Sequence, residues 1–119
     1  MVEKFELVRS YKISVAHKLP WHKGQCSNLH GHTLQIDIHI SSDRLNENGV
    51  VMDFHEIDKY VKPLIKLLDH SNLNYWLGEN ATVENLARFI WDVLEDTLPL
   101  SKVVIWESDR SRVEYSRVC

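Results

Sequence analysis

Two long segments of alternating apolar and polar residues constrain the fold of this chain most. In the first, large side chains occupy every second position from residue 5 to residue 15, and the segment ends at Ala16-His17. In the second, from about His32 to Ser41, the alternate positions hold Leu34, Ile36, Ile38 and Ile40. A period of two places one set of side chains on one face of a strand. The sequence therefore predicts two long strands that each bury one face.

Two segments of helical period follow the second strand. Asp53 is positioned to cap a helix over residues 54–68, in which apolar side chains recur every three or four positions. Pro63 lies inside this pattern, so we expect a kink or a local break there. Thr82 is positioned to cap a second helix over residues 83–98, which ends before the next proline.

Two shorter strands, over residues 102–107 and 112–118, close the chain, and residues 71–79 between the helices are expected to form a loop. The order β-β-α-α-β-β predicts an α+β fold, with a four-stranded antiparallel sheet and two helices on one face. The second face of such a sheet and its edges would have no cover. We therefore expect a homo-oligomer.

Length and composition restrict the class of protein. A chain of 119 residues with 44% hydrophobic residues is expected to fold as one domain, residues 1–119. The formal net charge of −3 argues against a nucleic-acid partner, and no stretch reaches the ~20 apolar residues of a membrane span. The N-terminus is too charged for a signal peptide. Cys26 could pair with Cys119, but a reduced, cytoplasmic chain explains two cysteines better.

Three histidines form the most specific chemical pattern. His30 and His32 stand two apart, and in a strand their side chains would share one face, roughly 7 Å apart. His17 ends the first strand, and Gly31 leaves room for a metal or substrate to approach. Zinc held by three protein ligands keeps a fourth position for water or substrate, which is the catalytic arrangement. We predict a three-histidine metal site, although imidazole ligands also suit nickel, cobalt or iron.

Cys26 lies four residues before His30 and has three candidate roles. It could be a fourth zinc ligand, an inert small hydrophobe, or a reactive thiolate whose pKa a nearby cation lowers. Four ligands would make a closed, structural site. Spacing alone does not separate these roles.

Asp69-His70 and Glu107 are further candidates. His70 could have only a structural role, because the helix dipole favours a histidine at the C-terminal end of a helix. If the pair lies beside Cys26, Asp69 and His70 would instead form an acid/base dyad, in which the aspartate orients the imidazole. Glu107 is expected to share a strand face with apolar side chains, where a carboxylate is costly unless paired. Its partner could be Arg112, or a flat heterocycle with adjacent N–H donors.

Six motifs, in order and at matching spacing, carry a resemblance that covers nearly the whole chain. The chain resembles the 6-pyruvoyl-tetrahydropterin synthase / 6-carboxy-tetrahydropterin synthase family of tunnelling-fold (T-fold) enzymes. The motifs are Ser14-Val-Ala-His17, Cys26-x3-His30-Gly-His32, Gly49-Val-Val-Met-Asp53-Phe54, Leu68-Asp69-His70-x2-Leu73-Asn74, Thr82-Val-Glu84-Asn85-Leu86-Ala87 and Trp106-Glu107.

The resemblance implies a fold, an assembly and a set of roles. Members of the family share the T-fold, assemble as trimers stacked into hexamers, and place their active sites between subunits. The acid/base partners of the cysteine would come from a neighbouring subunit. By matching motifs, zinc would be held by His17, His30 and His32, the thiolate base would be Cys26, its acid/base partners would be Asp69 and His70, and the pterin would contact Glu107 and Thr82.

The spacing within one motif resembles one branch of the family. Three residues separate Cys26 from His30, as in the 6-carboxy-tetrahydropterin synthases of queuosine biosynthesis, whereas pyruvoyl-forming synthases typically have a longer gap. A third branch has glutamate in place of the cysteine. Two departures are visible, because Ala81 and Ser108 stand where proline and threonine are common.

The implied reaction is that of a zinc-dependent lyase. It would convert 7,8-dihydroneopterin triphosphate to 6-carboxy-5,6,7,8-tetrahydropterin, acetaldehyde and triphosphate. Two alternatives stay open. One is elimination of triphosphate without C–C cleavage, which gives 6-pyruvoyl-tetrahydropterin. The other is a non-catalytic, zinc-stabilised assembly domain in which Cys26 is the fourth ligand.

Overall fold

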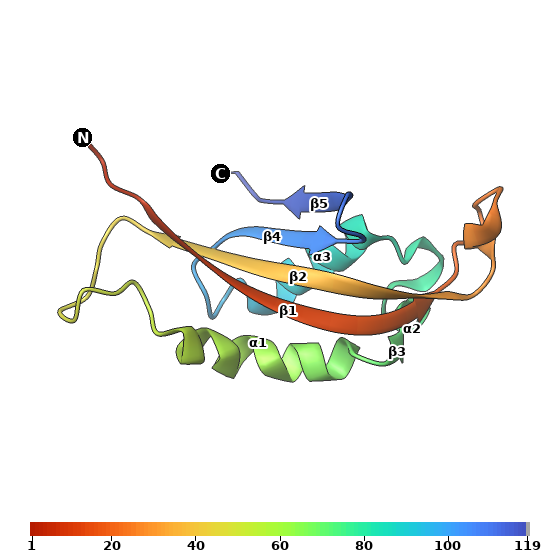
Figure 1. Ribbon diagram of the computed structural model, residues 1–119, viewed down its shortest axis with the longest axis horizontal. Helices are drawn as coiled ribbons and strands as arrows, with labels where there is room; N and C mark the ends of the chain where they lie inside the picture. The colour runs from red at the N-terminus through yellow and green to blue at the C-terminus, as the bar shows by residue number, and fades with distance from the viewer. Residues whose placement is uncertain (119) are drawn as a thin grey trace.

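A long antiparallel hairpin forms the backbone of the fold. The computed structural model describes residues 1–118; Cys119, the candidate disulfide partner of Cys26, lies outside the described residues. Strand β1 (Phe5–His17) pairs with β2 (His30–Ser42) over its full length, from Phe5 opposite Ser42 to His17 opposite His30 (Figure 1). The first strand is as predicted. The second begins two residues earlier, so that both His30 and His32 lie in it.

The sheet contains one strand more than expected. Its order is β3-β1-β2-β4-β5, with β3 (Ser71–Asn72), β4 (Leu100–Trp106) and β5 (Arg112–Tyr115). β3 runs parallel to β1, so the predicted four-stranded antiparallel sheet is in fact a five-stranded mixed one. The extra strand forms because the chain returns to the edge of β1 where α1 ends, and the His70 N–H donates to the Ser14 carbonyl at 2.6 Å.

Three α-helices accompany the sheet: α1 (Phe54–Leu68), α2 (Leu73–Leu77) and α3 (Val83–Leu94). Two 3-10 turns, η1 (Gln25–Ser27) and η2 (Gly78–Asn80), lie in the connections. The expectation of a loop over residues 71–79 is therefore wrong in part: Asn72 caps α2 by accepting a hydrogen bond from the Asn74 N–H at 2.9 Å. No helix within residues 1–118 combines the length and apolar character needed to cross a membrane.

The predicted helix caps are present, but the break at Pro63 is not. Asp53 caps α1, which continues unbroken through Pro63. Pro63 and Lys59 are both exposed, so water can reach the Lys59 carbonyl that a proline cannot bond. α3 ends at Leu94 rather than reaching residue 98, because the N–H and hydroxyl of Thr97 both turn back to the Leu94 carbonyl.

The core lies between the sheet and the helices α1 and α3, which cover the same face (Figure 1). Each fully buried aliphatic side chain contributes about 1.5–3 kcal/mol. Members of the core from the sheet and both helices include Ile13, Leu34, Ile36, Ile38, Ile57, Val61, Leu86, Ile90, Val103 and Ile105.

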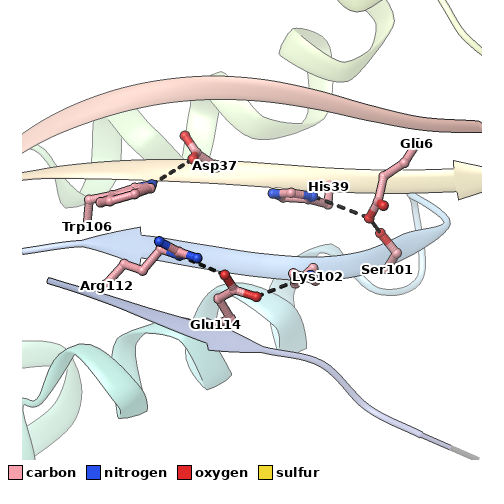
Figure 2. A network of polar contacts seen from close by, with 8 residues as sticks. All are labelled: Glu6, Asp37, His39, Ser101, Lys102, Trp106, Arg112 and Glu114. Carbon is pink, nitrogen blue, oxygen red and sulfur yellow. Dashed lines mark hydrogen bonds and ion pairs between the residues drawn. The ribbon is translucent and has the colours of Figure 1, made fainter. Parts of the chain in front are cut away.

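The opposite face of the sheet carries polar side chains that bond to one another. Figure 2 shows Glu6 between two of these partners, with its Oε1 accepting from the Ser101 hydroxyl at 2.6 Å and lying 3.3 Å from His39 Nδ1. These contacts connect β1, β2 and β4. The His39 side chain, on this outward face of β2, is consequently only 17% exposed.

A buried carboxylate joins α1 to β1. Asp58, 6% exposed, accepts hydrogen bonds from Arg9 Nε at 3.1 Å and Nη2 at 2.8 Å, and from the Tyr11 hydroxyl at 2.6 Å. The guanidinium of Arg9 is the main reason that the pKa of Asp58 lies well below its usual range, and the Tyr11 hydroxyl adds to the effect. The carboxylate therefore stays ionised and fixes α1 on the hairpin.

Replacing Asp58 with Asn should lower the free energy of unfolding at pH 7 by about 1–3 kcal/mol, because its donors lose a charged acceptor. The pKa of Asp58 is lower in the folded chain. Its contribution is therefore complete above the unfolded pKa of about 3.9 and is lost as pH falls through the folded pKa. Urea unfolding measures the free energy of unfolding of wild type and variant at pH 7 and at pH 3. The difference between the two proteins should be smaller at pH 3. The same difference at both pH values would contradict the conclusion that Asp58 is ionised in the folded chain.

Candidate metal centre and active site

Three imidazoles converge where the β1–β2 hairpin leaves the core. His17 and His30 are directly paired across the two strands, and His32 follows on the same face of β2. One nitrogen from each ring can be chosen so that all three lie within 4.8 Å of one another. The predicted cluster is therefore present, and it arises from two strand ends that the hairpin register brings side by side.

The hydrogen bonds of two rings point their free nitrogens at the same space. His17 Nδ1 lies 2.7 Å from the Ala81 carbonyl, and His30 Nδ1 lies 2.7 Å from the Asn28 carbonyl. A carbonyl only accepts, so each Nδ1 carries the proton and each Nε2 keeps a lone pair. Both Nε2 atoms are buried and have no partner among the described residues. A zinc ion held by imidazole nitrogens fits this arrangement.

His32 is suited to the same task by its surroundings. Burial is the main reason that its pKa is lowered, and the neighbouring His17 adds to the effect, while Glu107 opposes it. Glu107 Oε1 lies 3.9 Å from His32 Nε2. A lowered pKa keeps the ring neutral near pH 7, which is the form that binds a metal.

Glu107 is exposed, contrary to expectation. β4 ends at Trp106, so Glu107 lies beyond the strand with 45% of its side chain accessible, and its carboxylate carries no burial cost. Arg112 does not serve as its partner, because Arg112 Nε donates to Glu114 at 2.7 Å. The carboxylate is left to act on other groups.

A small hollow of about 140 Å³ lies beside this carboxylate, and its lining includes Glu107, Val83 and Ser111. Thr82, the residue before Val83, caps α3 by accepting from the Asn85 N–H at 3.1 Å. The structure thus places the Thr82 segment next to Glu107. It also connects this segment to the metal centre, because the preceding carbonyl, that of Ala81, holds His17.

Asp69 and His70 form a turn at the edge of β1. Asp69 Oδ1 accepts from the Ser14 N–H at 2.7 Å, and this backbone bond is the main reason that the pKa of Asp69 is lowered. Asp69 Oδ2 lies 3.1 Å from His70 Nδ1. His70 has a φ of 61°, a left-handed conformation that non-glycine residues rarely adopt, and its side chain is 81% exposed. The aspartate therefore orients an imidazole that faces outward.

An open hollow of about 640 Å³ brings this turn toward the metal centre. Its lining includes His32, Gly31 and Thr33 from β2 and His70 from the turn. Within one chain, a candidate metal ligand and the candidate acid/base histidine thus border the same space.

Cys26 lies in η1 and is half-buried. Among residues 1–118, the group of candidate ligands contains the three histidines and not Cys26. The loop that carries it is held at both ends, since the Leu19 N–H donates to the Cys26 carbonyl at 2.8 Å and Trp21 Nε1 donates to the Glu79 carbonyl at 3.1 Å. This geometry favours a site with three protein ligands over one with four.

Comparison with known proteins identifies the family of this chain. Residues 6–118 match the family described as 6-pyruvoyl tetrahydropterin synthase. The chain belongs to this family. It is 38% identical over 117 residues to the 6-carboxy-5,6,7,8-tetrahydropterin synthase of Synechocystis, covering 92% of this chain and 91% of the relative. It is 35% identical over 102 residues to the 6-pyruvoyl tetrahydrobiopterin synthase of Pongo abelii, covering 77% and 70%.

A solved structure shows the same fold. The 6-pyruvoyl tetrahydropterin synthase of Caenorhabditis elegans superposes with a TM-score of 0.86 at 22% identity, and the match covers 98% of each chain. The T-fold expected from the motifs is therefore confirmed, together with the family.

The metal centre makes a direct prediction. The purified chain should hold about one zinc ion, and His32→Ala should weaken zinc binding at least 100-fold, because one of three ligands is lost. Cys26→Ala and His39→Ala should keep wild-type affinity, because neither side chain belongs to the cluster. Competition with a chromophoric chelator measures the affinities. If Cys26→Ala lowered the zinc affinity as much as His32→Ala does, Cys26 would be established as a fourth ligand instead.

Proposed function

We propose that this chain is a zinc-dependent 6-carboxy-5,6,7,8-tetrahydropterin synthase of queuosine biosynthesis. It takes 7,8-dihydroneopterin triphosphate and a water to 6-carboxy-tetrahydropterin, acetaldehyde and triphosphate. The observation that carries the proposal is the convergence of the histidines, with two buried Nε2 atoms that have no hydrogen-bond partner within residues 1–118. The name of the Synechocystis relative supports the choice of product.

Substrate binding is assigned to the rim of the centre. The exposed carboxylate of Glu107 accepts hydrogen bonds from the adjacent N–H groups of the pterin's pyrimidine ring, which two carboxylate oxygens match in spacing. Thr82 contacts the same ring from the start of α3. Glu107 lies close to His32, so a pterin held there places its side chain at the metal centre.

Proton transfer is assigned to Cys26 and to the Asp69-His70 pair. The three imidazoles would hold a zinc ion, which would supply Lewis-acid polarisation of the side-chain hydroxyls. Cys26 removes the carbon-bound proton next to the ring, and His70 moves protons as triphosphate leaves and the C–C bond breaks. Asp69 orients His70 at 3.1 Å. A reactive thiolate suits the reducing cytoplasm.

The Asp69-His70 pair is assigned to a neighbouring subunit of a homo-oligomer, a trimer or a dimer of trimers. The His70 side chain is 81% exposed in the single chain, which leaves it accessible to a second copy. The strained backbone of His70 and the Asp69–Ser14 bond fix the direction in which the imidazole is presented.

A second candidate activity is the pyruvoyl-forming one, and the 35% identity to the Pongo abelii relative favours it. It shares the proton transfers and the loss of triphosphate and stops before C–C cleavage. The non-catalytic assembly domain has less support, because it requires Cys26 as a ligand and the cluster forms without it.

Product analysis tests the proposal. The zinc-loaded protein with 7,8-dihydroneopterin triphosphate should release acetaldehyde and a 6-carboxy-pterin in equal amounts, detected by mass spectrometry. Cys26→Ala should lower the rate by about 100-fold or more, because the base is lost, while keeping its zinc. A pyruvoyl product without acetaldehyde would establish the second candidate, and no turnover by the zinc-loaded wild type would refute both.

Subunit mixing tests the shared site. Cys26→Ala and His70→Ala should each be nearly inactive as separate oligomers. After dissociation and joint reassembly in equal amounts, about a quarter of sites would pair an intact Cys26 with an intact His70 from a neighbour, so that fraction of wild-type activity should return. Each variant reassembled alone is the control. Activity that stays at the level of the separate variants would show that one chain supplies both residues.

A further inference from the structure

The candidate pterin anchor, Glu107, directly follows the last residue of strand β4 and has no partner on β2 in the backbone pairing. The last pair between β4 and β2 is Trp106 opposite Gln35. Glu107 lies one residue further, and its N–H donates to the Ser111 carbonyl at 2.9 Å, within the β4–β5 connection. The backbone ladder therefore does not fix Glu107 relative to β2, the strand that supplies His32.

A side-chain bond joins the two strands at this point. Trp106 Nε1 donates to Asp37 Oδ2 at 2.9 Å, as Figure 2 shows. Asp37 lies on β2 and is 8% exposed, and its Oδ1 accepts from the Ser10 hydroxyl at 2.6 Å and from Gln35 Nε2 at 3.0 Å. A buried carboxylate is costly unless its oxygens are bonded, so these three donors hold it firmly.

The indole of Trp106 is also held from the other side of β4. Arg112 is its cross-strand neighbour on β5, and the guanidinium carbon lies 4.8 Å from the ring centroid. Glu114 accepts from Arg112 at 2.7 Å and pairs with Lys102 at 3.2 Å (Figure 2). The last residue of β4 is thus fixed to both neighbouring strands by its side chain.

We propose that Asp37 is a positioning residue for pterin binding. Through Trp106 it sets where the end of β4 lies against β2, and so where the Glu107 carboxylate stands relative to His32. Asp37 is an odd number of residues from His30 and from His32, so its side chain lies on the opposite face of β2. It therefore does not touch the substrate. The inference rests on the proposed function, in which Glu107 binds the pterin.

Two variants remove the bond in different ways. Asn at position 37 offers a single acceptor oxygen, so either Trp106 or the Ser10 and Gln35 donors lose their partner. Trp106→Phe keeps an aromatic ring and removes only the indole donor. Both variants should raise the Kd for neopterin, measured by its fluorescence, about tenfold. They should raise KM similarly and leave kcat within about twofold, because a binding contact is weakened equally in ground and transition states.

Asp58→Asn is the matched control. Asp58 is 6% exposed and accepts three side-chain hydrogen bonds, from Arg9 and Tyr11, on the helix-covered side of β1. Asp58→Asn should therefore lower the free energy of unfolding without changing the Kd for neopterin. The double variant Asp37→Asn/Trp106→Phe should bind neopterin no more weakly than the weaker single one, because both remove the same bond.

The outcomes separate the two proposals. A rise in Kd for both variants, with Asp58→Asn unchanged and zinc content at wild-type level, supports the positioning role. If Glu107→Ala weakens neopterin binding but Asp37→Asn and Trp106→Phe match Asp58→Asn, the positioning role is refuted and the pterin site stands. If Glu107→Ala binds neopterin as wild type does, the pterin anchor itself is wrong and the positioning role falls with it.

Discussion

The pairing of β1 with β2 determines the rest of the structure. Thirteen residues of each strand are aligned, so one register fixes both the core and the cluster of three histidines. At one end the register brings His17 opposite His30, and along the middle it places Ile13 beside Leu34. A slip of one residue would turn every side chain of one strand to the other face. The histidines cannot be misplaced without exposing the apolar side chains, so the core enforces the geometry of the site.

The histidine cluster contributes buried polar atoms that need a partner. The Nε2 atoms of His17 and His30 are buried and have no hydrogen-bond partner within residues 1–118, and a buried polar atom left without a partner typically costs about 1–3 kcal/mol. A metal ion coordinated by these Nε2 atoms would satisfy them, so metal binding would recover this free energy. The carbonyls of Ala81 and Asn28 hold the rings in the tautomer that leaves a lone pair on Nε2, so the two rings are already oriented for metal binding.

Sequence patterns predicted the features that depend on periodicity and on side-chain type. The alternation along β1 and β2 located both strands, and the capping residues Asp53 and Thr82 located the starts of the two long helices. Features that depend on the third dimension were missed. The two carbonyls that orient the histidines carry no sequence signal, because any residue supplies a carbonyl. The prediction that Glu107 lies on a strand face was wrong, because β4 ends at Trp106, one residue before the predicted end. The end of a strand depends on its pairing with neighbouring strands, which the sequence does not show.

The outward face of the sheet bears on the proposed assembly. The expectation of an oligomer began from an uncovered face, yet that face satisfies its own polar groups: Asp37 has three donors, and Glu6 binds Ser101. Such a face has no need of an apolar partner. The edges differ, because within residues 1–118 β1 pairs on its outer side only at Val15 and Ala16. The backbone of residues 5–13 has no strand partner along that edge, because Ser14 already bonds to Asp69 and His70, and β5 is the other edge. Copies joined edge to edge would pair these groups and keep the polar face in contact with water.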